Sequence, residues 1–480
     1  MMENAMSPTE PRMELGMIGL GVMGRNLLLN MADHGFPVSG YDQDQAKVEA
    51  LLREGKGLDL AGAGDLQGLL AGLRAPRAVM LLVPAGAPVD AVIAELVPLL
   101  GPGDLIIDAG NSHFTDTDRR GAELAARGLL FMGMGISGGE NGARRGPSMM
   151  PGGSPEAYQR VRALLEAVAA QAGGAPCVAH VGPGSAGHYV KMVHNGIEYA
   201  LMELIAESYD LMKRGLGMDN AGIRRSFQEW SEGGLGGYLM EITAAIFGRR
   251  DTLAGQDLID AVLGVARQKG TGMWTSQSAM ELQVPAPTID QAVAQRDLSA
   301  LDRERERAAR VLPRTTGLRR HDGDRGVFLV SLGQALHAGM VMAFAQGMAM
   351  LGAASVRYGY QLDLGTVARI WRGGCIIRAA LLEDIAAAYA RDPSLPNLLL
   401  DPDLARTVLS REESLRAVVC AGARTGTPIP GLMSALAYLD GYRSPWLPAN
   451  LIQAQRDCFG AHTYERVDLP GHFHTEWEQE

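Results

Sequence analysis

The sequence predicts an α/β domain followed by a large all-helical domain and an irregular C-terminal tail. Up to residue 184, short β-rich runs alternate with amphipathic segments, which favours βα units on a parallel sheet. From residue 185 to 441, long stretches of Ala, Leu, Met, Glu and Arg predict helices. Three prolines interrupt the rest of the chain. We therefore expect domains at residues 1–184 and 185–441 and a tail at 442–480.

The first domain is expected to contain strands that are apolar or β-rich and are ended by Gly, Pro, Asp or Asn. They cover residues 15–18, 37–41, 79–83, 105–108 and 129–132. Amphipathic helices are expected between them, for example at residues 25–33 and 46–53.

A glycine-rich turn with GxGxxG spacing follows the first strand and consists of Gly19, Leu20, Gly21, Val22, Met23 and Gly24. Gly19 permits a tight turn, Gly21 lets the backbone approach a pyrophosphate, and Gly24 permits close helix–strand packing. The helix that follows offers free N–H groups to phosphates. The second strand leads to Asp42, 18 residues after Gly24, where an acidic residue binds a ribose 2′-OH. We therefore expect a Rossmann-type dinucleotide-binding domain.

The residues after the second strand also indicate which cofactor is preferred. Asp42, Gln43 and Asp44 begin a stretch, residues 42–46, that contains no Arg or Lys to neutralise a 2′-phosphate. The two carboxylates would repel that phosphate, so we expect NAD to be preferred over NADP.

The overall charge excludes several classes of partner. The chain has 44 basic and 54 acidic residues and a net charge of −10, whereas nucleic acids and anionic membranes require a basic surface. We expect neither as a partner. A small anion needs only a local group of cations and remains compatible with this balance.

Several features predict a cytoplasmic protein. The polar residues 1–12 contain no apolar segment of a secretory signal. Residues 326–356 lack Asp, Glu, Lys and Arg, but they include Ser, Gln, His and many Gly and Ala residues, which lower the hydrophobicity of the segment. This composition favours a helix buried on all sides over a membrane span. The four cysteines form no CxxC pair and are expected to be buried free thiols, without a disulfide framework or a zinc site.

The most informative helix covers residues 188–202. Lys191, His194, Asn195, Glu198 and Tyr199 are spaced i, i+3, i+4, i+7 and i+8 and therefore share one face. The other faces are too apolar for a surface helix, so we expect this face to line a polar cavity. A lysine and a carboxylate two turns apart could divide the base and acid roles if burial shifts their pKa values.

Seven motifs resemble those of the decarboxylating 6-phosphogluconate dehydrogenase family along essentially the whole chain. They are GLGVMG at 19–24, DAGNS at 108–112, SGGENGAR at 137–144, KMVHNGIEY at 191–199, QKGTG at 268–272, WRGGCIIR at 371–378 and LPANLIQAQRD–FGAHTYE at 447–465.

The resemblance implies that the 3-OH of 6-phosphogluconate is oxidised with a nicotinamide cofactor and that the β-keto acid then loses CO₂ to give ribulose 5-phosphate, without a metal. It implies that Lys191 takes the 3-OH proton and later returns a proton to the carbonyl oxygen. Glu198 would protonate C1 of the enediol.

The resemblance also extends the binding sites. With the glycine turn, it gives a cofactor site of Gly19, Leu20, Gly21, Val22, Met23, Gly24, Asp42, Gln43, Asp44, Val83, Pro84, Ala85 and Asn111. The sugar acid would be held by Asn111, Ser137, Gly138, Gly139, His194 and Asn195. The phosphate would be held by Tyr199, Lys269, Arg296 and Arg456. In this family the tail crosses to the neighbouring subunit, which implies a homodimer in which Arg456 and His462 complete the partner's site.

The chain departs from the family pattern in the cofactor region. Common members carry Asn-Arg-Thr where this chain has residues 42–44, and that Arg contacts the NADP 2′-phosphate. Pro84 also stands where many members have Lys. Both departures resemble the NAD-preferring branch of the family. Ala109 and Met273 replace a usual Gly and a usual Lys without removing a catalytic group.

Three alternatives stay open. The same reaction could prefer NADP. The chain could be a related β-hydroxyacid dehydrogenase that acts on a 3-hydroxyacid without phosphate, although such relatives lack Lys269, the long helical domain and the tail motif. A dinucleotide-binding sensor or structural dimer would leave the Lys191–Glu198 face inert.

Overall fold

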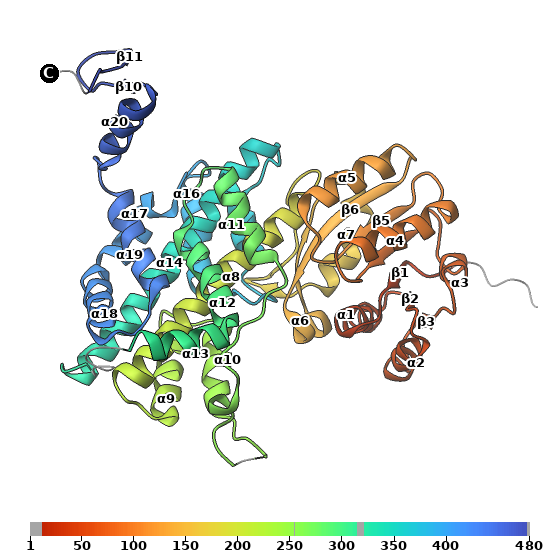
Figure 1. The fold of residues 1–480 in the computed structure, drawn as a ribbon. Coiled ribbons are helices and arrows are strands. Elements are labelled where there is room, and N and C mark those ends of the chain that lie inside the picture. The colour runs from red at the N-terminus through yellow and green to blue at the C-terminus, as the bar shows by residue number, and fades with distance from the viewer. Residues whose placement is uncertain (1–11, 254, 314–320, 478–480) are drawn as a thin grey trace, which may run out of the picture. The chain divides into compact units, whose positions relative to one another are not determined.

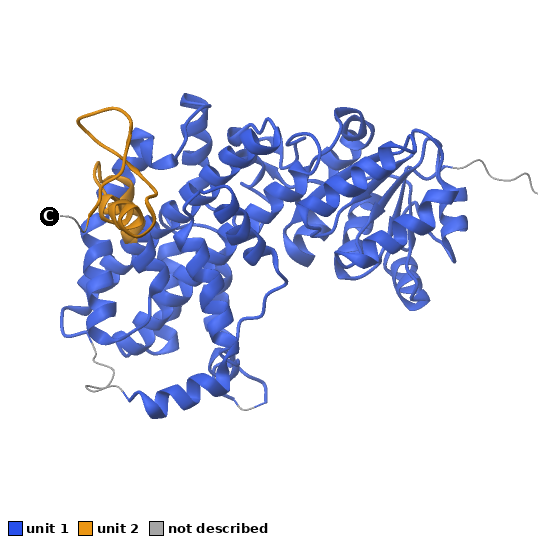
Figure 2. Ribbon diagram, turned by 45° about the horizontal axis from the view of Figure 1, so that its top comes forward, with its two compact units in different colours: residues 1–435 blue, residues 436–480 orange. Residues whose placement is uncertain are grey.

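The computed structural model describes residues 12–253, 255–313 and 321–477. The chain divides into two compact units, Met1–Ala435 and Leu436–Glu480, which we describe separately (Figures 1 and 2). The polar segment at residues 1–12 lies outside the described residues except for Arg12.

Within the described residues, seven strands form one sheet in the order β3-β2-β1-β4-β5-β6-β7. The first six are parallel, and β7 pairs antiparallel with β6. The bounds are β1 Leu15–Ile18, β2 Val38–Tyr41, β3 Leu60–Gly62, β4 Ala78–Leu81, β5 Leu105–Asp108, β6 Leu130–Ser137 and β7 Ser148–Pro151. This order confirms the Rossmann-type domain, in which ligands bind beyond the carboxyl ends of the parallel strands.

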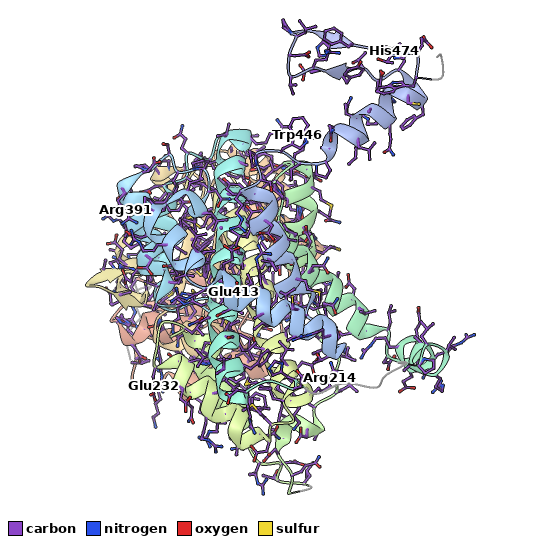
Figure 3. All side chains as sticks on the ribbon, turned by 90° about the vertical axis from the view of Figure 1, so that its left-hand side faces the viewer. Arg214, Glu232, Arg391, Glu413, Trp446 and His474 are labelled. Carbon is purple, nitrogen blue, oxygen red and sulfur yellow. The ribbon has the colours of Figure 1, made fainter. Side chains whose placement is uncertain are left out.

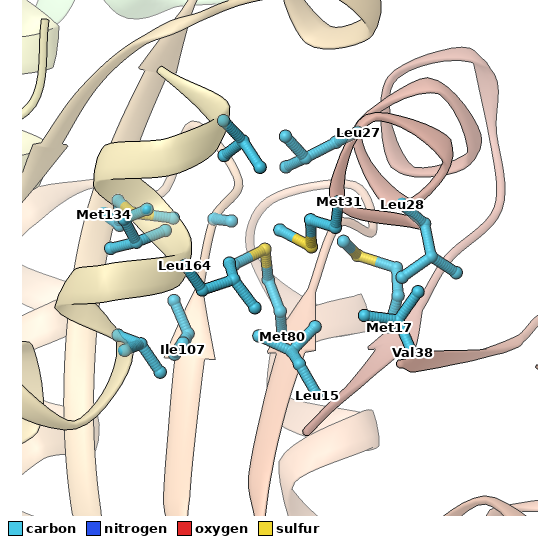
Figure 4. Packing of buried hydrophobic residues seen from close by; sticks show 14 of the residues in the cluster. Leu15, Met17, Leu27, Leu28, Met31, Val38, Met80, Ile107, Met134 and Leu164 are labelled. Carbon is cyan, nitrogen blue, oxygen red and sulfur yellow. The ribbon is translucent and has the colours of Figure 1, made fainter. Parts of the chain in front are cut away.

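Helices cover both faces of the sheet (Figure 1). They are α1 Val22–Asp33, α2 Gln45–Glu54, α3 Leu66–Ala71, α4 Ala87–Leu96, α5 Phe114–Ala125, α6 Gly139–Arg145 and α7 Pro155–Val168, with a 3₁₀ turn, η1, at Val97–Leu99. Alternate strand residues enter two separate cores: Met17 and Met80 pack with Met31 of α1 and Leu164 of α7 (Figure 4), and Ile18 packs on the other face. The strands are apolar throughout because both faces of a parallel sheet are buried.

The expected strands at 15–18 and 105–108 are confirmed, and others differ in their limits. β4 ends at Leu81, because Leu82 and Val83 already belong to the loop that leads to α4. β6 continues to Ser137 although its glycines resemble a strand break. β3 and β7 were missed, since one has only three residues and the other follows a glycine-rich segment without alternation.

The second half of the first unit is helical, as expected. Its helices are α8 Ala186–Asp210, α9 Asn220–Ser231, α10 Tyr238–Phe247, α11 Thr271–Glu281, α12 Pro287–Ala300, α13 Asp302–Val311, α14 Arg325–Tyr358, α15 Leu364–Ile370, α16 Leu381–Arg391, α17 Pro402–Leu409 and α18 Glu412–Thr425. Helix α19 (Pro430–Tyr442) begins in the first unit and continues into the second. Shorter turns are η2 Leu211–Gly215, η3 Leu258–Ala261 and η4 Leu398–Leu400. The expected domain boundary at residues 184/185 stays a prediction; helix α8, which begins just after it, packs directly on β6 and β7.

Helix α14 explains the uncharged segment of the sequence. Among the described helices it is long and apolar enough to cross a membrane, but 61% of its most apolar window is buried inside the protein. It packs against α8 and α18 as a central helix of the domain. The outer surface carries charged side chains instead, such as Arg214, Glu232, Arg391 and Glu413 (Figure 3).

The C-terminal unit is more regular than expected. The expected tail is present, but residues 449–460 form helix α20 (Ala449–Gly460) and strands β10 (Tyr464–Glu465) and β11 (His472–Phe473) form a hairpin. The buried carboxylate of Asp457 holds this unit together by accepting hydrogen bonds from the backbone N–H groups of Thr463 and Thr475 and from the indole of Trp477. It also contacts His474, which Figure 3 labels.

The cysteine expectation is only partly right. Cys177 and Cys375 are buried free thiols, whereas Cys420 and Cys458 are exposed free thiols on the outer faces of α18 and α20.

Candidate active site

Helix α8 lies unusually close to strand β6 because two glycines of the strand leave room for it. A Cβ added at Gly135 would stand 2.3 Å from Cβ of Lys191, and one at Gly133 would stand 2.8 Å from Nδ1 of His188. Real Cβ atoms do not approach this closely. The two glycines therefore fix where α8, and with it Lys191, lies beside the carboxyl end of β6.

The polar face of α8 is buried, as expected. Lys191 is 6% exposed, Asn195 is 8% exposed, and His194 is fully buried. His194 Nε2 lies 3.2 Å from the hydroxyl of Ser137 at the end of β6. Its Nδ1 lies 3.2 Å from Oδ1 of Asn195 and 3.8 Å from Oε2 of Glu198. The structure thus brings the face of α8 and the loop after β6 into one site.

Burial moves the two candidate catalytic groups toward their neutral forms. It lowers the pKa of the Lys191 amine, although the nearby Glu198 carboxylate acts against this. It raises the pKa of Glu198, against the attraction of Lys191 and Arg296. Burial and the charge of Lys191 together hold the pKa of His194 well below its usual range. A neutral amine can accept a proton and a neutral carboxyl can donate one, so this face can perform acid–base chemistry.

A cation from another helix packs against α8 at its next turn, where Tyr199 lies. The guanidinium carbon of Arg296, on α12, lies 3.4 Å from the centre of the Tyr199 ring. The carboxyl of Glu203 lies near this cation, and burial raises its pKa to about 7. Lys269 is exposed in the segment that leads to α11. This segment lies along α12, because Gln268 donates to Asp297 at 2.5 Å.

The glycine turn has the form that a dinucleotide requires. Gly19 has a φ of 97°, and α1 begins after it without a side-chain cap, so N–H groups at its N-terminus stay available. A Cβ added at Gly21 would meet nothing within 4 Å, which leaves the backbone open to a phosphate group. Val83, Pro84, Ala85 and Asn111 follow β4 and β5 at the same edge of the sheet. The residues present therefore fit a nicotinamide dinucleotide.

Asp42 has more partners than the sequence suggested. Its carboxylate accepts the backbone N–H groups of Leu20 at 2.8 Å and Asp44 at 2.9 Å. Lys47 places its amine 3.2 Å from the same carboxylate, so the acidic stretch has a counter-charge one helical turn away. Asp44 also caps α2 by accepting the N–H of Ala46. Gln43 is exposed beside them.

The remaining expected residues lie in other segments. Arg456 and His462 lie exposed in the C-terminal unit, at the end of α20 and in the turn after it. Gly138 lies between β6 and α6 and Gly139 is the first residue of α6, next to the Ser137 contact, and Asn111 is exposed after β5. Within the described residues, no group of three or more His, Cys, Asp and Glu side chains could hold a metal ion.

Sequence reasoning missed the loop that closes over this site. The indole of Trp371 packs edge-on against His194 with ring centres 5.4 Å apart. The backbone N–H of Ile376 lies 3.4 Å from the Ser137 hydroxyl, and Cys375 beside it is buried, which raises its pKa to about 12. These residues belong to the WRGGCIIR motif, whose sequence signalled the resemblance but not the contact.

Comparisons with known proteins show which family the chain is similar to. Residues 14–182 match the family "NAD binding domain of 6-phosphogluconate dehydrogenase", and residues 187–477 match "6-phosphogluconate dehydrogenase, C-terminal domain". The decarboxylating 6-phosphogluconate dehydrogenase of Synechococcus elongatus is 49% identical over 469 residues, which cover 97% of this chain and 99% of that protein. The NADP(+)-dependent decarboxylating enzyme of Bacillus subtilis is 47% identical, over 97% of this chain and 99% of its own.

A solved structure has the same fold over nearly the whole length. It is 6-phosphogluconate dehydrogenase of Plasmodium falciparum, described in its apo form and in complexes with its cofactor NADP⁺ and its substrate 6-phosphogluconate. The TM-score is 0.94 and the identity 41%, over 97% of this chain and 100% of that one. The chain therefore belongs to the family of decarboxylating 6-phosphogluconate dehydrogenases.

Proposed function

We propose that this chain oxidises 6-phosphogluconate, decarboxylates the product to ribulose 5-phosphate and CO₂, and prefers NAD as the hydride acceptor. The observation that carries the proposal is that the buried Lys191 and the largely buried Glu198, whose side chain is 20% exposed, share one face of α8, where burial lowers the pKa of the amine and raises that of the carboxyl. A surface pair would keep both groups charged at neutral pH.

The two groups divide the proton transfers. In its neutral form Lys191 accepts the proton of the 3-OH; a nicotinamide cofactor held at the turn after β1 and the loops after β4 and β5 would supply the hydride acceptor. The resulting ketone is the electron sink for loss of CO₂, and Lys191 returns its proton to that oxygen. Glu198, whose pKa burial raises, then donates a proton to C1 of the enediol. Ser137, His194 and Asn195 hold the sugar acid in place.

The phosphate would bind one turn farther along α8. Arg296 and Lys269 supply positive charge, and the Tyr199 hydroxyl lies on the ring against which Arg296 stacks. Charge-assisted hydrogen bonds from a guanidinium suit a phosphate dianion. The alternative substrate, a 3-hydroxyacid without phosphate, would leave Arg296 without an anionic ligand in this region.

The preference for NAD rests on the acidic end of β2. Asp42 holds its carboxylate in place through two backbone N–H groups, where it can accept a ribose 2′-OH. Lys47 neutralises part of its charge, but the side chains of residues 42–46 supply no further cation for a 2′-phosphate. The Bacillus subtilis relative is named as NADP(+)-dependent, so this chain would differ from it.

We also propose that a homodimer completes the site with Arg456 and His462 of the second copy. In helix α20 the apolar residues Leu451, Ile452 and Phe459 have exposed fractions of 60%, 60% and 75%. Large apolar side chains grouped on a surface are typical of an interaction site. Covering these side chains by a partner would remove that surface from water.

An assay with two readouts tests the proposal. The absorbance of reduced nicotinamide is followed with 6-phosphogluconate and with gluconate, each with NAD and NADP, and CO₂ release is measured alongside. The proposal requires equal amounts of reduced cofactor and CO₂, little activity on gluconate, and a higher kcat/KM with NAD. Equal rates on both acids contradict the phosphate site, and a clear preference for NADP contradicts the cofactor assignment.

A further inference from the structure

A single buried arginine joins the two loops that follow neighbouring strands at the cofactor edge of the sheet. The loop at residues 82–86 follows β4 and carries Pro84 and Ala85, and the loop at residues 109–113 follows β5 and carries Asn111. Arg120 lies on α5, and its side chain is only 1% exposed. It is enclosed beneath both loops and does not face solvent.

The guanidinium of Arg120 donates hydrogen bonds to both loops. Nη2 donates to the carbonyl oxygen of Gly86 at 3.1 Å, which holds the first loop. Nη1 donates to Asp108 at 3.3 Å and to the Ser112 hydroxyl at 3.1 Å, which holds the second. Nε donates to Asp90 at 2.7 Å and so fixes the first turn of α4.

Asp108 links Arg120 to the other residues of the second loop. Its fully buried carboxylate accepts the backbone N–H of Gly110 at 3.1 Å and the hydroxyl of Ser112 at 2.6 Å. The exposed Asn111 lies between these two residues. The position of Asn111 is therefore determined by this hydrogen-bond network. Among the contacts described for the loop, Arg120 supplies the one cation.

A buried ion pair is a costly way to join two loops unless its geometry is needed. The planar guanidinium can bind three acceptors in fixed directions at once, whereas a lysine ammonium is a flexible point charge that cannot reproduce the fork. Apolar packing would stabilise the loops without fixing their relative register.

We propose that Arg120 is a positioning residue for the nicotinamide cofactor: it holds residues 82–86 and 109–113 in the register that lets Pro84, Ala85 and Asn111 contact one dinucleotide. This inference rests on the proposed function, which assigns those residues to the cofactor. Arg120 acts on the cofactor only through the loops.

The test compares Arg120→Lys with Arg119→Lys. Arg119 is the neighbouring residue, is 44% exposed, and also donates to Asp90, at 2.9 Å, but it contacts neither loop. Dissociation constants are measured for NADH, for NADPH and, separately, for 6-phosphogluconate. We expect Arg120→Lys to weaken binding of the better dinucleotide about tenfold and binding of 6-phosphogluconate by about threefold at most, because Asn111 alone among the residues of the two loops is also assigned to the sugar acid. Arg119→Lys should change neither.

Unchanged dinucleotide binding in Arg120→Lys, or equal losses for dinucleotide and sugar acid, would overturn the inference. If Arg120→Lys does not fold, Ser112→Ala removes one acceptor of the same guanidinium and should weaken dinucleotide binding by about twofold to threefold, whereas no change in that variant overturns the inference as well. If the proposed function itself is wrong, the unmodified enzyme does not turn over 6-phosphogluconate, and the dinucleotide comparison can still be made.

Discussion

Gly135 of β6 and Lys191 of α8 lie so close together that a methyl group on the glycine would stand 2.3 Å from Cβ of the lysine. The strand backbone thus sets the position of the amine that we assign to proton transfer. The consequence can be measured at the glycine without changing the lysine.

Gly135→Ala should displace α8 and lower activity together with stability. Overpacking a core position costs about 1–3 kcal/mol of the free energy of unfolding, and a small shift of Lys191 should lower kcat more than it raises KM. Denaturant unfolding and steady-state kinetics measure both. Gly64→Ala is the control, because a Cβ there meets nothing within 4 Å. Wild-type kcat in Gly135→Ala would show that the position of α8 is not critical.

The pH dependence should report the coupled pair of Lys191 and Glu198. The proposed active form has a neutral amine and a neutral carboxyl. As pH rises, activity should therefore increase when the pair loses its first proton and decrease when it loses its second. Because burial lowers the pKa of Lys191 and raises that of Glu198, both limbs should lie between the usual values of the two groups. Glu198→Gln should lower kcat and leave a profile with one limb; a two-limbed profile in this variant would mean that another group titrates.

Recognition of the phosphate should depend on Arg296. A hydrogen bond to a charged group contributes about 1.5–3 kcal/mol, so Arg296→Gln should lower kcat/KM for 6-phosphogluconate by about 10-fold to 100-fold. The activity on gluconate should stay nearly constant, because that acid has no phosphate. Tyr199→Phe keeps the stacked ring and should have a smaller effect. Equal losses on both acids in Arg296→Gln would place the arginine outside the phosphate site.

Cofactor choice should respond to the charges after β2. The double variant Asp42→Asn with Gln43→Arg removes a carboxylate and adds a guanidinium at the exposed Gln43, so kcat/KM for NADP should rise about tenfold or more. NAD activity should fall, because Asp42 accepts from the Leu20 N–H and, in our proposal, from the ribose. Glu49→Gln changes one charge on the exposed side of α2 and serves as control. An unchanged ratio of the two cofactors would argue against the role of Asp42.

The sequence carried enough information for the turn at residues 19–24 and for the polar face of α8, because both are local patterns with one periodicity. Contacts between distant segments could not be read in the same way. Gly133 and Gly135 resemble strand breakers until the helix against them is known. The contact of Lys47 with Asp42 is local, but it forms only because α2 begins between the two residues. It changes the charge balance that residues 42–46 suggest.

The contacts of Arg120 and Trp371 could not be predicted from the sequence either, since each residue contacts a partner that is far away along the chain. Arg120 lies in a helix whose other charges are solvated, and only its burial separates it from Arg119. The regular elements of the tail escaped prediction because the segments after α20 are joined to it by hydrogen bonds to one buried carboxylate, Asp457, which no periodic pattern reveals.

The central claim is that Lys191 performs the proton transfers, and Lys191→Met tests it most directly. The assay follows reduced nicotinamide and CO₂ with 6-phosphogluconate, and NADH binding is measured on the same preparation. Loss of a group that acts first as general base and then as general acid should lower kcat by about a thousandfold or more while the dissociation constant for NADH stays within about twofold. Turnover close to that of the unmodified enzyme, with NADH binding intact, would contradict the assignment of Lys191.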